Sequence, residues 1–224
     1  MTRTNALSLG FVVLSFGAAA ALYGHLPDPV PSHWNSGGEP DGFMAKPWGA
    51  FVLPLVMAGV YMLLACIPRV SPRGFRVGRF REAFGAVQVA VLAFLALVSV
   101  LALLAATGVT LSPNRVIHTA LGLLFIVIGN YMSKFTRNFL VGIRTPWTLA
   151  SDEVWLRTHR LGGRLFVLAG LVLVVSGMLG GGRSVVLTAV GIAAGIPAVY
   201  SYVVYRRIET LKNGSARRES SHPS

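Results

Sequence analysis

The sequence is poor in charged residues, and acidic ones above all. Only 12% of its 224 residues are charged, and Asp and Glu together number 8. A soluble domain of ordinary composition carries about 25% charged residues. With 54% hydrophobic residues and a mean hydropathy of +0.64, the chain has too little polar surface to cover a globule in water. These shortages exclude an ordinary soluble domain and indicate a lipid environment.

Cysteine is also scarce. Cys66 stands alone in the sequence, inside an apolar run, so an intrachain disulfide is excluded and the thiol is expected to serve packing. No set of Cys and His residues has the spacing of a metal site. We therefore predict no cofactor and no enzymatic activity.

Long apolar runs are what the sequence has in abundance. A membrane-spanning helix needs about 20 mainly apolar residues. Runs of about this length occur at 6–23, 48–67, 83–106, 116–132, 165–179 and 185–205. The sequence therefore predicts an all-α fold, a polytopic transmembrane bundle of about six spans. Gly177-x-x-x-Gly181 and Gly191-x-x-x-Gly195 predict close helix approach, within one bundle or at a homodimer seam, so the oligomeric state stays open.

The distribution of basic residues predicts the orientation. Of the 20 Lys and Arg residues, only Lys46, Arg115 and Arg183 fall in loops that would lie outside if the N-terminus is inside. Basic residues are retained on the cytoplasmic side of a bacterial inner membrane. We therefore predict an N-in, C-in topology facing an anionic inner leaflet. The net charge of +12 then needs no nucleic-acid partner.

The predicted outer loop, residues 24–47, is rich in proline and ends in a Pro-Asp-Gly turn signal. We predict an ordered cap that could meet a cationic or amphipathic peptide from the medium. The candidate binding residues are His33, Trp34, Asn35, Glu39 and Asp41. A metal site built from His25, His33, Glu39 and Asp41 is the weaker interpretation, because their spacing is irregular.

The predicted inner loop, residues 130–164, is the stretch richest in motifs. Ser151 followed by Asp152 and Glu153 predicts a helix start, which would give a short interfacial helix before span five, ending near Leu161. His159, within this helix, is expected to be hydrogen-bonded and structural rather than catalytic. The candidate partner-binding or structural residues are Asn130, Arg144, Thr145, Pro146, Trp147, Trp155, His159 and Arg160.

Two stretches resemble known bacterial membrane families. The first, which resembles the outer loop of the DUF1648 domain, reads Leu26-Pro-Asp-Pro-Val-Pro-Ser-His-Trp-Asn-Ser-Gly-Gly-Glu-Pro-Asp-Gly. The second resembles the signature of the SdpI-like immunity family and reads Gly142-Ile-Arg-Thr-Pro-Trp-Thr-Leu, then Glu153-Val-Trp, then Thr158-His-Arg-Leu-Gly-Gly. The sequence departs from relatives at Ser133 and Arg137, which leaves the second motif intact.

This resemblance implies a function and a division of the chain. It implies immunity to a secreted, membrane-active peptide toxin, with signalling to a cytosolic regulator as a further role. The expected units are a DUF1648-like helical hairpin at 1–68, a four-span domain at 69–205 and a basic disordered tail at 206–224. The alternative function is a transporter or permease for a small molecule or peptide, which would require a polar cavity across the bundle.

Overall fold

The predicted six-span bundle is confirmed by a computed structural model that describes residues 2–35, 39–70, 77–109 and 113–220. Six of its helices are long and apolar enough to cross a membrane. A short helix, α5 (Pro146–Ala150), precedes the fifth of them, as predicted. The six are α1 (Arg3–Leu22), α2 (Lys46–Val70), α3 (Arg81–Ala106), α4 (Pro113–Met132), α6 (Asp152–Leu179) and α7 (Arg183–Ser220).

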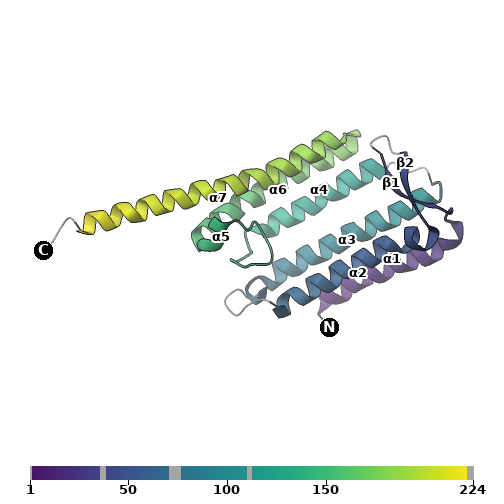
Figure 1. Ribbon diagram of the computed structural model, residues 1–224, viewed down its shortest axis with the longest axis horizontal. Helices are drawn as coiled ribbons and strands as arrows, with labels where there is room; N and C mark the ends of the chain where they lie inside the picture. The colour runs from purple at the N-terminus through teal and green to yellow at the C-terminus, as the bar shows by residue number, and fades with distance from the viewer. Residues whose placement is uncertain (1, 36–38, 71–76, 110–112, 221–224) are drawn as a thin grey trace.

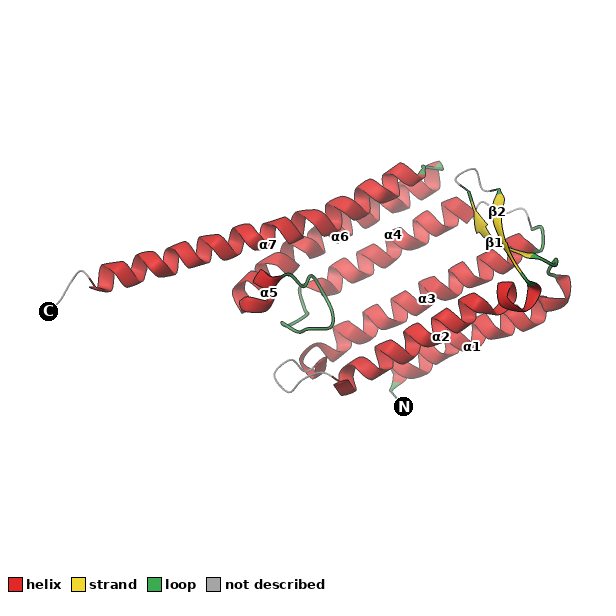
Figure 2. Cartoon of the chain, in the orientation of Figure 1, coloured by secondary structure: helices red, strands yellow, loops and turns green. Residues whose placement is uncertain are grey.

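The helices lie side by side in an elongated bundle with two unlike ends (Figure 1). One end, here called the α5 end, holds the N-terminus, α5 and the loop before it. The other, the hairpin end, holds a two-stranded antiparallel sheet of β1 (Val30–Trp34) and β2 (Pro40–Met44). These are the only strands among the described residues, and the rest is helix and loop (Figure 2).

The helices pack in two groups of three. In the first, α1, α2 and α3 contact one another around buried Val12, Met57 and Leu92. In the second, α6 contacts both α4 and α7, with Leu173 and Ala193 fully buried between α6 and α7. The groups meet where α3 packs on α4, so α3 joins the N-terminal pair in space.

The contact between α4 and α6 is the closest in the bundle and is made by glycines. A Cβ added to Gly129 would lie 2.6 Å from the carbonyl oxygen of Gly163, and one added to Gly122 would lie 2.6 Å from that of Gly170. The two glycines in each helix are seven residues apart, or two helical turns, so they fall on one face. Only glycine allows these two backbones to touch.

This seam differs from the glycine motifs expected from the sequence. Of those, Gly177 does face α4, where an added Cβ would meet Thr119. Gly191 and Gly195 have open space instead, with nothing within 4 Å of an added Cβ. The sequence analysis considered glycines four residues apart and therefore missed those seven residues apart in α4 and α6. A homodimer seam on α7 stays a prediction.

The helix expected to begin at Ser151 does begin there, and the Ser151 hydroxyl accepts a hydrogen bond from the backbone N–H of Val154. Its expected end near Leu161 is wrong, because the helix runs unbroken to Leu179. Gly162 and Gly163, which could end a helix, instead pack against Met132 and α4. Tertiary contact therefore outweighs the poor helix propensity of glycine here.

The tail predicted to be disordered after Tyr205 is also different. The structure continues α7 as a helix to Ser220, beyond the end of the bundle (Figure 1). Two contacts one turn apart favour the continuation: the Tyr205 hydroxyl lies 2.9 Å from a carboxylate oxygen of Glu209, and Thr210 donates to the carbonyl of Arg206. The sequence analysis weighted the polar composition and missed these pairs.

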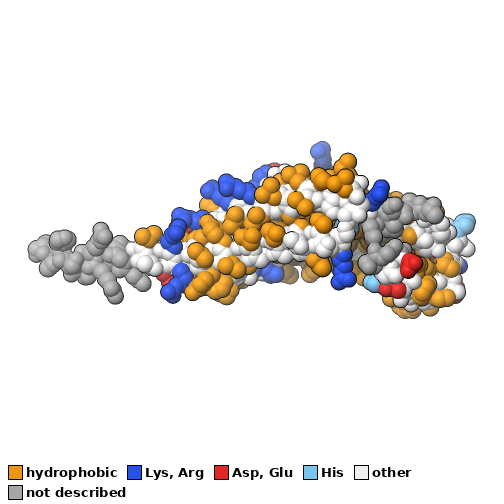
Figure 3. All heavy atoms as spheres, turned by 90° about the horizontal axis from the view of Figure 1, so that it is seen from above, with side chains coloured by type: hydrophobic (Ala, Val, Ile, Leu, Met, Phe, Trp, Pro, Cys, Tyr) orange, Lys and Arg blue, Asp and Glu red, His pale blue; other side chains and the backbone are white. Residues whose placement is uncertain are grey.

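Apolar side chains cover much of the visible long sides of the helices, and acidic and His side chains show near the hairpin end (Figure 3). Two of the basic residues that set the predicted orientation, Arg73 and Arg76, lie outside the described residues.

Candidate functional site

The outer motif folds into the β-hairpin. Val30 pairs with Met44 and Trp34 with Pro40, with irregular register between them. Pro31 and Pro40 each lack a backbone N–H, which a two-stranded ribbon tolerates because both strands are edges. The sequence analysis predicted order but no strands, since the prolines mask the alternation that signals a strand.

The hairpin brings four of the five predicted outer residues together as two cross-strand pairs. His33 Nδ1 contacts a carboxylate oxygen of Asp41. Asn35 donates to the Glu39 carboxylate at 3.3 Å and accepts from the Glu39 backbone N–H at 3.0 Å. The fifth, Trp34, is half-buried. Two acids of this loop therefore have partners within the loop itself.

The hairpin rests on the end of α2. Val30 is buried, and a Cβ added to Gly49 would lie 2.5 Å from its Cβ, so glycine allows the strand to touch the helix. A carboxylate oxygen of Asp28 accepts from the backbone N–H of Lys46, the first residue of α2. This bond satisfies one of the unpaired N–H groups at a helix start. The third acid of the loop is thus a helix cap.

The remaining surface of the hairpin end is apolar as well as acidic. At this end Phe43 is 56% exposed and Trp48 is 64% exposed. The weaker interpretation, a metal site, gains no support: among the described residues no three His, Cys, Asp or Glu side chains come close enough together to hold an ion.

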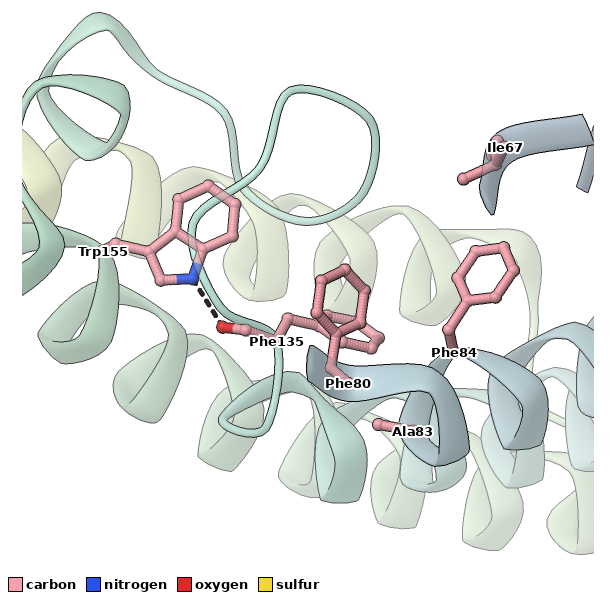
Figure 4. Close-up of a cluster of buried hydrophobic side chains, with 6 residues drawn as sticks. All are labelled: Ile67, Phe80, Ala83, Phe84, Phe135 and Trp155. Carbon is pink, nitrogen blue, oxygen red and sulfur yellow. Dashed lines mark hydrogen bonds between the residues drawn. The ribbon is translucent and has the colours of Figure 1, made fainter. Parts of the chain in front are cut away.

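The inner motif forms a buried cluster at the α5 end. The rings of Trp155 and His159, which are four residues apart on α6, stack with centroids 4.0 Å apart. Trp155 Nε1 donates to the carbonyl of Phe135 at 2.6 Å, which holds the loop after α4 onto α6 (Figure 4). Phe80 and Phe135 pack beside it, so this cluster joins both helical groups.

His159 is fully buried and both of its ring nitrogens bond the backbone. Nε2 accepts from the N–H of Ile143 at 3.1 Å, so that nitrogen carries no proton. Nδ1 therefore holds the proton of the neutral ring and donates it to the carbonyl of Trp155 at 2.9 Å. A His with both nitrogens engaged in this way serves structure, and it is not placed to act as a general base.

Gly142 makes this approach to His159 possible. Its φ is +108°, a conformation that side-chain-bearing residues rarely adopt. An added Cβ would also lie closer than 3.0 Å to His159 Nε2. The glycine of the motif is thus required twice, by its backbone angle and by the adjacent imidazole.

Thr145 and Thr148 secure the next part of the motif. Each side chain bonds the backbone N–H of the other, forming a capping box at the start of α5. The Thr145 hydroxyl also lies 2.9 Å from that of Ser201, which donates to the carbonyl of Ala198 in α7. The ring of Trp147 packs on Tyr202 of α7, at 5.0 Å between centroids. The motif therefore ties α5 to α7.

Asn138 is the structural residue that the sequence analysis missed. It is fully buried, accepts from the backbone N–H groups of Leu140 and Val141, and donates to the carbonyl of Thr136. These bonds close the turn before the motif. Asn is common in turns because its side chain can bond the nearby backbone in this way. An Asn seven residues before Thr145 could therefore have indicated a turn ahead of the motif. We call Asn138, Gly142, Thr145, Thr148, Trp155 and His159 the loop core.

Three arginines lie around the loop core. Arg144 is exposed and donates to the carbonyl of Phe139 at 2.6 Å. Arg137 pairs with Asp152 at 2.8 Å and donates to the carbonyl of Leu149. Arg157 pairs with Glu153 one turn earlier on α6. Pro146 occupies the first position of α5, where its missing N–H costs nothing.

Asn130 and Arg160 lie apart from the loop core. Both line a groove between α4 and α6, on the same surface as Ser133 and Arg164. The predicted inner set thus divides into residues that fix the loop, of which Trp155 and His159 are buried, and a polar pair that lines the groove.

The two motifs match known family models in the positions expected. Residues 10–58 match the domain of unknown function DUF1648, and residues 134–201 match the SdpI/YfhL protein family. The chain is 28% identical over 215 residues to the immunity protein SdpI of Bacillus subtilis (strain 168), which covers 95% of this chain and 99% of that protein. The chain is therefore similar to the SdpI/YfhL family over its C-terminal part and to DUF1648 over its N-terminal part. No solved structure gives a significant match.

Both matched stretches can be placed on the structure. The DUF1648 match includes the later part of α1, the hairpin and the first part of α2. The SdpI/YfhL match begins at the loop after α4 and ends at Ser201, the residue that Thr145 contacts. The family match therefore contains the whole loop core.

Proposed function

We propose that this protein is a non-enzymatic immunity protein of the bacterial inner membrane, acting against a secreted, membrane-active peptide. The observation that supports this proposal most strongly is the similarity to an immunity protein over nearly the whole of both chains. Because the alignment spans both ends, each surface of this chain has a counterpart in that relative.

The hairpin end is our candidate for the toxin-facing surface. The distribution of basic residues assigns it to the outside. This end presents two exposed aromatic side chains, Phe43 and Trp48, and the carboxylates of Glu39 and Asp41. An amphipathic, cationic peptide has the complementary chemistry, apolar side chains for the rings and positive charge for the acids.

The α5 end is our candidate for contact with a cytosolic regulator. The loop core holds the segment 134–150 in one conformation, and Arg144 and Phe139 lie exposed on its surface. A rigid, basic and partly apolar loop suits a partner that docks on the inner face. Signalling would then require this end but not the hairpin.

Survival of a sensitive bacterium expressing the protein tests this proposal. Cells carrying the wild-type chain should survive a panel of membrane-active peptides that kills cells with the empty vector. The variant Glu39→Gln with Asp41→Asn should lose most of this protection, because it removes two outer charges without adding positive charge outside. The matched control, Asp152→Asn with Glu153→Gln, makes the same charge change at the α5 end and should protect normally.

Equal killing of every strain across the panel would remove immunity as the function. Equal loss of protection in both paired variants would reject the hairpin as the toxin-facing surface. Membrane levels of each variant, measured by immunoblot, separate lost recognition from lost protein.

A further inference from the structure

A polar groove of about 620 Å³ lies between α4 and α6 toward the α5 end. Asn130 and Ser133 line it from one side, and Arg160 and Arg164 from the other, with Val167 and Leu168 beyond them. Its floor is the close contact of Gly129 with Gly163. Because two glycines meet there, no side chain fills the space between the helices.

The charge in this groove is uncompensated within the described part of the chain. Arg160 and Arg164 are one helical turn apart, both exposed, and neither forms an ion pair with a described carboxylate. Arg157, one turn before Arg160 on the same helix, does not line the groove and pairs with Glu153 at 2.6 Å. The groove thus presents two adjacent guanidinium groups that suit a bidentate anionic ligand such as phosphate.

The depth of the groove indicates where that phosphate comes from. The α4 span, Arg115–Met132, has 18 residues, or roughly 27 Å of helix, close to the hydrocarbon thickness of a bilayer. Asn130 is two residues from its end, and Arg164 follows the glycine that faces Gly129. These side chains therefore lie where the apolar interior gives way to phospholipid headgroups.

An apolar surface continues from the polar one. Leu168 also lines a second groove, of about 420 Å³, between α6 and α7, together with Leu165, Val172 and Ile192. A ligand with a phosphate at Arg160 and Arg164 would therefore lay a hydrocarbon chain over Leu168 and along this second groove.

We propose that the α4–α6 groove binds an anionic phospholipid, with its phosphate at Arg160 and Arg164 and an acyl chain along the α6–α7 groove. The amide of Asn130 and the hydroxyl of Ser133 supply further hydrogen bonds to the headgroup. A cytosolic protein fits less well, because half of the binding surface faces the hydrocarbon. The site is independent of the proposed toxin-facing surface.

Native mass spectrometry of the full-length protein tests this site. The purified chain is released from detergent with phosphatidylglycerol and phosphatidylcholine at equal concentration, and retained lipids are counted. The wild type should retain phosphatidylglycerol preferentially. Arg160→Gln with Arg164→Gln should reduce that preference about thirtyfold, since each basic residue near a bilayer contributes about 1 kcal/mol. Arg157→Gln, the matched control, should stay within twofold of the wild type.

Three outcomes would overturn the proposal. One is equal retention of phosphatidylglycerol by the double variant and the wild type. Another is displacement of the lipid by millimolar inorganic phosphate alone, which would indicate an anion site without a lipid. The third concerns a variant that combines Leu168→Asn with both arginine changes. The proposal fails if this variant still prefers phosphatidylglycerol and loses the preference only when a cytosolic extract is added. If the double variant does not fold, the single variant Arg160→Gln, at an exposed position, provides the same test with about a fivefold effect.

Discussion

At the hairpin end, the motif side chains pair with one another across two short strands and remain largely exposed. At the α5 end, Asn138, Thr148, Trp155 and His159 of the loop core are buried and bond the backbone. His33 and His159 illustrate the difference: the first has a 72% exposed side chain beside Asp41, and the second is fully buried between Ile143 and Trp155. The same residue type therefore serves a surface at one end and a scaffold at the other.

This difference predicts how each end should respond to substitution. A buried polar group that loses its partner costs about 1–3 kcal/mol, whereas an exposed pair contributes less than about 1 kcal/mol. Changes at the α5 end should therefore affect the free energy of unfolding, and changes at the hairpin end should affect recognition while leaving folding largely intact.

The largest expected effect is that of Gly142→Ala. The new Cβ would require a strained backbone and would also displace His159, so we expect a loss of about 4 kcal/mol in the free energy of unfolding. The measurement is denaturant or thermal unfolding of the protein in detergent. Gly108→Ala is the matched control, because Gly108 has φ +87° but nothing within 4 Å of an added Cβ. It should cost only about 1–2 kcal/mol; equal losses would mean that contact with His159 is unimportant.

The next effect compares the two histidines. His159→Ala leaves the Ile143 N–H unpaired and opens a cavity beside Trp155, so we expect a loss of about 3 kcal/mol. His33→Ala removes an exposed contact and should change the free energy of unfolding by less than about 0.5 kcal/mol. The same unfolding measurement serves both variants. A larger loss for His33 would show that the hairpin stabilises the bundle as much as the loop core does.

The number of spans and the helix start at Ser151 were predictable because they follow from simple physical limits. A run of about 20 apolar residues has few alternatives to a membrane helix, and Ser151 before two acids marks a helix start. The spacing of four between Trp155 and His159 places both on one helix face. In each case the signal lies within one stretch of sequence.

What could not be predicted depends on residues far apart in the chain. The hydrogen bond from Ile143 to His159 and the contact of Thr145 with Ser201 join separate segments, and their geometry is set by packing. The close contact of the glycines in α4 and α6 likewise depends on how the two helices are aligned. The sequence of either helix alone does not show that alignment. Asn138 was missed because its two backbone bonds exist only once the loop is closed.

The smallest expected effect is the difference in the free energy of unfolding between variants of two carboxylates at the hairpin end. Asp28 bonds the first backbone N–H of α2, so Asp28→Ala should cost about 1 kcal/mol, as the loss of a helix cap does elsewhere. Asp41 is bonded to an exposed His33 and caps nothing, so Asp41→Ala should cost less than about 0.5 kcal/mol. Hydrogen exchange followed by mass spectrometry reads this locally: the Asp28 variant should exchange faster in the first turn of α2, and the Asp41 variant should not. If both variants increased exchange in that turn equally, Asp28 and Asp41 would both stabilise the start of α2. The distinction between Asp41 as a recognition residue and Asp28 as a structural residue would then be wrong.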